Sequence, residues 1–131
     1  QAEGFEHVLA RSTGAYDVAH LQDSPGDDEL RARSHKSTFQ SAQMDLTVRG
    51  FDEVHAEAVF GGSDIAKLHD TAGNNHLTAS GNIARMWQND GVLDLLYEAI
   101  AFERVNAYWS TGTNTKDITL PIDFIFREIY L

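Results

Sequence analysis

The chain contains an internal repeat. Residues 17–32, DVAHLQDSPGDDELRA, align without a gap with residues 64–79, DIAKLHDTAGNNHLTA, at an offset of 47, and seven of the sixteen positions are identical. A second motif, Phe-x-x-Val-x-Ala, begins at Phe5, Phe51 and Phe102, at offsets of 46 and 51. A fixed period of about 20–50 residues is typical of repeat architectures, in which each unit packs against its neighbours. A unit that is repeated serves the architecture, so its residues are poor candidates for a unique active site.

The repeat divides the 131 residues into four pieces. We place a partial unit at 1–16, complete units at 17–63 and 64–116, and a partial unit at 117–131, all within one domain. Because the chain begins at Gln1 rather than Met, we expect a processed protein or a domain taken from a longer chain.

Apolar and polar residues alternate with a period of two in several short segments, which predicts half-buried strands. The alternation is clear at 18–22, 29–33, 44–49 and 54–58. Residues 91–101 have helical spacing instead, but they align with the alternating residues 44–56, so we predict strands at 92–100 and 102–109. The last segment, Ile122–Leu131, is rich in β-branched and aromatic residues and is predicted as a strand.

About four short strands in each 47-residue unit predict an all-β fold. A propeller needs at least about four blades to close, and this chain holds roughly two and a half units. We therefore expect a short, repeat-built β-solenoid similar to a parallel β-helix. The alternative is an irregular β-sandwich.

Composition excludes several classes of protein. The net charge of -10 and the pI of about 4.8 argue against binding to nucleic acid or to an anionic membrane surface. The absence of cysteine excludes disulfides and thiolate zinc sites. No apolar run is long enough to span a membrane as a helix, so membrane insertion is not expected.

The repeat resembles a family of arrays found in large secreted proteins of marine planctomycetes and related bacteria. The likeness lies in the pattern D-x-A-x-L-x-D-S-x-G-D-D-x-L-x-A at 17–32, followed by Gly50-Phe51-x-x-Val54-x-Ala56 and Gly61-Gly62-Ser63-Asp64, and it covers most of residues 1–80. This resemblance implies an extracellular or cell-surface protein. Residues 26–30, GDDEL, are also similar to part of the calcium-binding nonapeptide repeats of secreted toxins, although the nine-residue period is missing.

An acidic turn is the candidate metal site. Asp23, Asp27 and Asp28 surround a Pro-Gly bend, and calcium prefers several hard oxygen ligands of this kind. The same residues also form turns without any ion. In the second copy the last two acids are replaced by Asn74 and Asn75, which favours the turn. Calcium is therefore a possible cofactor of the first copy alone.

Two further groups are candidates for carbohydrate binding. Arg31 and Arg33 point the same way on a strand and could bind a sulfated or uronic polysaccharide through paired charges. Trp87 and Trp109 could form a platform on which sugars stack. Alternatively, the arginines balance neighbouring acids and the tryptophans pack in the core.

No catalytic residue is predicted, because the chain has no cysteine, no G-x-S-x-G motif and no ordered Ser/His/Asp set. We therefore expect an extracellular structural or adhesive domain, not an enzyme. It would bind extracellular polysaccharide or associate with itself through the strand at 122–131. A carbohydrate-binding module attached to a polysaccharide-degrading enzyme is the first alternative, and a small polysaccharide-active enzyme is the second.

Overall fold

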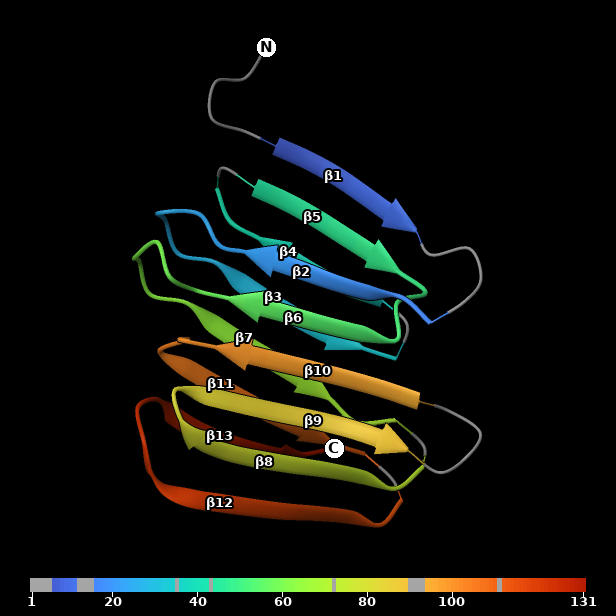
Figure 1. The fold of residues 1–131 in the computed structure, drawn as a ribbon. Helices are drawn as coiled ribbons and strands as arrows, with labels where there is room; N and C mark the ends of the chain where they lie inside the picture. The colour runs from blue at the N-terminus through green and yellow to red at the C-terminus, as the bar shows by residue number, and fades with distance from the viewer. Residues whose placement is uncertain are drawn as a thin grey trace.

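The computed structural model describes residues 6–11, 16–34, 36–42, 44–71, 73–89, 94–110 and 112–131. These residues form two sheets that face one another (Figure 1). Within the described chain, sheet A has seven strands in the order β1 (Glu6–Arg11), β5 (Met44–Arg49), β4 (Lys36–Gln40), β3 (Glu29–Arg33), β7 (Ile65–His69), β11 (Arg104–Trp109) and β13 (Ile125–Tyr130). Sheet B has six, in the order β12 (Asn114–Ile122), β8 (Asn75–Gly81), β9 (Ile83–Asn89), β10 (Asp94–Ile100), β6 (Glu53–Glu57) and β2 (Val18–Gln22).

The core lies between the two sheets and follows from the alternation in the sequence. In β3, for example, Leu30 and Ala32 are buried while Glu29, Arg31 and Arg33 face outward. Strands β2 to β11 each contribute one such face, and their buried side chains belong to one hydrophobic cluster. Many of them are alanines, among them Ala32, Ala56, Ala66, Ala84 and Ala107, each at 0% exposure. Small residues at these positions let the two sheets approach closely around the larger Phe39, Leu68 and Met86.

Each repeat unit corresponds to five strands. Counted from each Phe-x-x-Val-x-Ala motif rather than from residues 17 and 64, the first unit comprises β1 to β5 and the second comprises β6 to β10, while β11 begins a third. Within a unit the last three strands form two antiparallel pairs, β3–β4 and β4–β5 in the first unit and β8–β9 and β9–β10 in the second. The pairs that join one unit to the next are parallel, such as β2–β6, β3–β7 and β8–β12.

The two copies of the sequence motif lie in opposite sheets. Residues 18–22 form β2 in sheet B, whereas the matching residues 65–69 form β7 in sheet A. The Phe-x-x-Val-x-Ala motif likewise alternates between β1 in sheet A, β6 in sheet B and β11 in sheet A. The cause is topological. The chain crosses between the sheets three times per unit, and an odd number of crossings starts the next unit in the other sheet.

The predicted all-β class is confirmed, and the described residues contain no helix. The finer expectation of a parallel β-helix is not shown, because both sheets are mixed and open. The predicted strands at 92–100 and 102–109 correspond to β10 and β11, within the described residues. The strand predicted at Ile122–Leu131 corresponds to β13, which begins only at Ile125 because a bend at 123–124 separates it from β12 and buries Phe124. The described chain has no helix long and apolar enough to cross a membrane.

Candidate functional site

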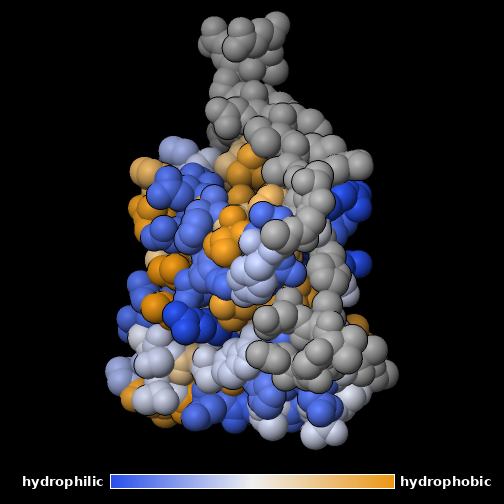
Figure 2. Space-filling view, turned by 45° about the vertical axis from the view of Figure 1, so that its right-hand side comes forward, coloured by the Kyte–Doolittle hydropathy of each residue, from blue (hydrophilic) through white to orange (hydrophobic). Residues whose placement is uncertain are grey.

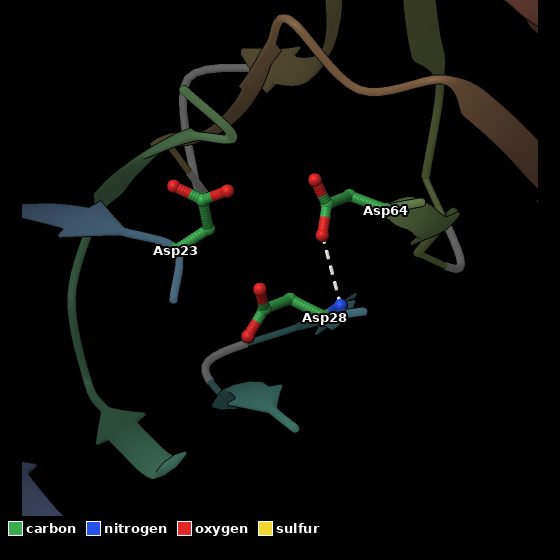
Figure 3. Close-up of side chains that lie close together, drawn as sticks. All are labelled: Asp23, Asp28 and Asp64. Atoms are coloured by element: carbon green, nitrogen blue, oxygen red, sulfur yellow. Dashed lines mark hydrogen bonds between the residues drawn. The ribbon is translucent and has the colours of Figure 1, made fainter. Parts of the chain in front are cut away.

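Three aspartates converge where the first unit meets the second. Asp23 follows β2, Asp28 precedes β3, and Asp64 precedes β7. They are buried, at 6%, 1% and 1% exposure respectively, and one carboxylate oxygen of each lies within 4.8 Å of the others. Figure 3 shows the three carboxylates directed toward a common space. Convergence of this kind is a consequence of stacking, because Asp23 and Asp28 come from one unit and Asp64 from the next.

Hydrogen-bond donors hold each carboxylate in place. The backbone amides of Val59 and Phe60 donate to Asp23 at 2.9 and 3.0 Å. The amide and the hydroxyl of Ser24 donate to Asp28, at 3.1 and 2.9 Å. These hydrogen bonds fix the positions of two of the three carboxylates.

Asp64 is the least satisfied of the three. Its Oδ1 accepts the backbone amide of Asp28 at 2.8 Å, whereas its buried Oδ2 has no hydrogen-bond partner among the described residues. Desolvation first, and then the neighbouring charges of Asp23, Glu103 and Asp28, raise the pKa of Asp64 to about 7, against the lowering effect of the hydrogen bond from the Asp28 amide. A buried oxygen without a partner is costly and needs an explanation.

The same constellation recurs where the second unit meets the third, with one carboxylate and two side-chain amides. Asp70, Asn75 and Asn114 occupy the positions of Asp23, Asp28 and Asp64. The backbone bonds match, since the amide of Asn75 donates to Asn114 Oδ1 at 3.2 Å as the amide of Asp28 does to Asp64 Oδ1. Thr71 donates to Asn75 from its amide and hydroxyl, as Ser24 does to Asp28.

The two constellations differ at one atom in particular. Nδ2 of Asn114 donates to Asp70 Oδ2 at 3.4 Å, and the corresponding atom of Asp64 is the unpartnered Oδ2. Nδ2 of Asn75 likewise donates to the carbonyls of Thr71 and Gly73. A side-chain amide hydrogen therefore joins Asn114 to Asp70 in the second constellation, whereas the first constellation brings together three carboxylates.

The predicted metal ligands are partly brought together. Asp23 and Asp28 belong to the cluster, but Asp27 is exposed and accepts the backbone amide of Ser63 at 2.8 Å. Asn74 does the same for Thr113 in the second unit, which identifies this residue as part of the turn. Sequence reasoning missed Asp64. The repeat could have indicated Asp64, because both copies of the motif begin with an aspartate, Asp17 in the first and Asp64 in the second.

A second feature is the basic outer face of sheet A. Seven of the ten lysines and arginines project from this face, namely Arg31, Arg33, Lys36, Arg49, Lys67, Arg104 and Arg127. Glu29 pairs with Lys67 at 2.9 Å and Arg31 at 3.7 Å. The other five make no ion pair with another described residue. A chain of net charge -10 thus gathers most of its positive charge on one sheet.

Like charges are direct neighbours on this face. Arg33 is opposite Lys36 in the register, and Lys36 is opposite Arg49. Like charges directly across two strands destabilise a sheet. The pKa of His69 is lowered to about 4, first by desolvation and then by the positive charges of Arg33 and Arg31. Its ring stacks on Tyr108 with centroids 4.4 Å apart.

The outer face of sheet B has the opposite character. It presents Glu53, Glu57, Glu98 and Asp117 at outward register positions, with Arg85 as the basic residue among the described positions of that face. Although burial opposes it, the hydrogen bonds of His55 to the carboxylates of Glu98 and Glu53 raise the pKa of His55. The basic residues of sheet A thus contribute to the lowered pKa of His69, whereas the carboxylates of sheet B raise the pKa of His55.

The predicted carbohydrate residues are not assembled into one site. Arg31 and Arg33 line a surface depression together with Lys36, Thr38 and Gln40. Trp87 lies on the outer face of sheet B, stacked on His76, and Trp109 is buried at the end of β11. The two tryptophans therefore do not share a platform with the arginines. In Figure 2 the hydrophobic residues of the described surface occur in small separated groups.

Comparisons with known protein families, with curated proteins and with solved structures found no match to the chain.

Proposed function

We propose that this chain is an extracellular structural or adhesive repeat domain that binds an anionic polysaccharide through the outer face of sheet A. The observation that carries the proposal is the concentration of seven basic side chains on that face. The parallel pairing of successive units supports a short solenoid-like stack, in which each further unit would extend the same face. The resemblance of the repeat to secreted arrays supports an extracellular location.

The chemistry of the face fits sulfate or carboxylate groups on a flexible chain. Arginine can form two parallel hydrogen bonds to such groups. Of the five arginines on this face, four are exposed and form no ion pair with a described residue, namely Arg33, Arg49, Arg104 and Arg127. The strong overall negative charge disfavours large, uniformly charged partners such as nucleic acid, because these would also meet the acidic remainder of the molecule.

The test is binding to immobilised heparin, used as a sulfated polysaccharide. We expect retention at low salt and release as the salt concentration rises, since counterions are displaced on binding. Replacing Arg31, Arg33 and Lys36 together with Gln should weaken binding at least about tenfold, because hydrogen bonds to charged groups contribute about 1.5–3 kcal/mol each. Arg85→Gln, on the opposite sheet, is the matched control and should leave binding unchanged. Failure of the intact chain to bind at low salt would contradict the proposal, as would equal loss in the control.

A second candidate function is self-association through the edges formed by β12 and β13. Leu120 and Tyr130 are 75% and 74% exposed there, and both strands lie at the ends of their sheets. Exposed apolar residues on an edge strand favour pairing with another chain.

Light scattering tests this second candidate. We expect the apparent mass to rise with protein concentration, and Leu120→Glu combined with Tyr130→Glu should reduce that rise. The control is Val59→Glu, which changes an apolar side chain that is 51% exposed and lies away from the two edges. An intact chain that stays monomeric at every concentration would rule out association.

A further inference from the structure

We propose that Asp23, Asp28 and Asp64 bind one calcium ion that joins the first repeat unit to the second. The site is separate from the basic face and does not depend on the proposed polysaccharide. Two ligands come from the turn between β2 and β3, and the third comes from the residue that precedes β7. A cation held between them would fix the stacking of the units at the point where the chain crosses between sheets.

The spacing of the carboxylates suits calcium. Their oxygens lie within 4.8 Å of one another. Two oxygens bound to the same calcium at about 2.3–2.6 Å can be up to about 5 Å apart, so separations within 4.8 Å fit a shared calcium ion. The cluster contains only hard oxygen ligands, and these suit calcium better than zinc or copper.

The unpartnered oxygen of Asp64 is an independent reason to expect a ligand. The residue is 1% exposed, its Oδ2 has no partner among the described residues, and its carboxylate points into the space shared with Asp23 and Asp28 (Figure 3). A charge buried in this way is strongly destabilising unless it is paired or coordinates a metal. None of the three carboxylates forms an ion pair with a described basic side chain.

The second constellation shows what the same backbone does when two of the three carboxylates are replaced by amides. There, Nδ2 of Asn114 supplies the hydrogen that joins it to Asp70, and Nδ2 of Asn75 satisfies two carbonyls. The first unit has carboxylate oxygens in place of both amide nitrogens. A cation bound by the first constellation would therefore hold its oxygens together, as the side-chain amide of Asn114 does in the second. The exchange of Asp for Asn between the two copies would then separate a site that binds a cation from one that does not.

The primary experiment adds calcium chloride to the intact protein after chelating resin has removed metal ions. We expect isothermal titration calorimetry at neutral pH to give one site per chain. At about a hundred times the dissociation constant, calcium should raise Tm by roughly 5–10 °C, because it binds the folded state only. Magnesium at the same concentration should give a smaller shift. The absence of both heat and Tm shift would overturn the proposal, and a larger shift with magnesium would overturn the assignment to calcium.

Asp64→Asn tests the ligand set with little risk to folding, because Asn114 already fills the equivalent position in the second constellation. We expect this variant to lose calcium binding and to melt at the same temperature with calcium and with EDTA. Asp27→Asn is the matched control, since Asp27 lies in the same turn outside the cluster, and it should bind calcium as the unchanged chain does. Retained binding in Asp64→Asn, or its loss in Asp27→Asn, would overturn the proposal.

The reverse exchange should create a second site. Asn75→Asp combined with Asn114→Asp places two further carboxylates beside Asp70 in the second constellation. We expect a lower Tm than that of the unchanged chain in EDTA, recovery of Tm on addition of calcium, and two calcium ions per chain. A folded variant that still binds a single ion would show that this arrangement of carboxylates does not bind calcium and would overturn the proposal.

Discussion

Replacing Phe39 with Ala should lower the free energy of unfolding by about 3–5 kcal/mol, the cost of deleting a large buried ring and leaving a cavity. Phe39 is on β4 and has 0% exposure. Its ring packs on that of Phe102, with centroids 5.8 Å apart. Because Phe102 begins the third Phe-x-x-Val-x-Ala motif, the contact ties the hairpins of the first unit to the unit two steps along the chain. The alanine-rich surroundings have few side chains able to fill the space.

Phe60→Ala makes the same chemical change at a side chain that is 55% exposed and serves as the control. We expect a change within about 0.5 kcal/mol, which is normal for surface substitutions. Urea unfolding followed by circular dichroism measures both variants. Similar losses in the two would contradict the core described here, since they would mean that Phe39 contributes no more than an exposed ring.

The all-β class could be predicted because the alternation of apolar and polar residues in this chain is local and regular. Leu30 and Ala32 face the core as their spacing indicates, and β10 is a strand in spite of the helical spacing of its apolar residues. In that segment the repeat was the better guide, because the equivalent residues 44–49 alternate clearly. Tertiary pairing with β6 and β9 decides the structure of β10.

The alternation of the units between sheets could not be read from the repeat. Identity between the two motif copies shows that their local structure is similar but does not say which sheet each joins. That depends on the number of crossings, and hence on the two tight hairpins in each unit. The turn at Ser34 has a positive φ of 22° without a glycine, so the sequence gives little sign of it.

Only part of the aspartate cluster and of the basic face could be predicted, because each combines residues from different repeat units. Asp23 and Asp28 stand close together in the sequence, whereas Asp64 joins them through stacking of the next unit, 36 residues beyond Asp28. The basic face was similarly recognised only at Arg31 and Arg33. Lys67 and Arg104 belong to it because β7 pairs in parallel with β3, and β11 pairs in parallel with β7. Local patterns identify the members within one unit, and topology supplies the rest.

Gly62→Ala should be the most damaging change in the loop that covers the aspartate cluster, with a loss of about 3 kcal/mol or more in the free energy of unfolding. Gly62 has a φ of +86°, and a Cβ there would lie 2.1 Å from the carbonyl oxygen of Gly26. The backbone at Gly62 or at Gly26 would have to shift to relieve this clash, and either shift would displace the turn that contains it. Left-handed conformation alone costs an alanine about 1–2 kcal/mol, so the clash accounts for the remainder.

Gly61→Ala separates the two contributions, because Gly61 also has a positive φ, +95°, but its added Cβ would meet nothing within 4 Å. We expect a loss of only about 1–2 kcal/mol in this variant, measured by the same urea unfolding. Equal losses at the two positions would show that the contact between the turns is unimportant. The loop also donates the amides of Phe60 and Ser63 to Asp23 and Asp27. Displacing it through Gly62→Ala should therefore weaken calcium binding as well as folding, whereas Gly61→Ala leaves the loop seated on the turn and should preserve the affinity.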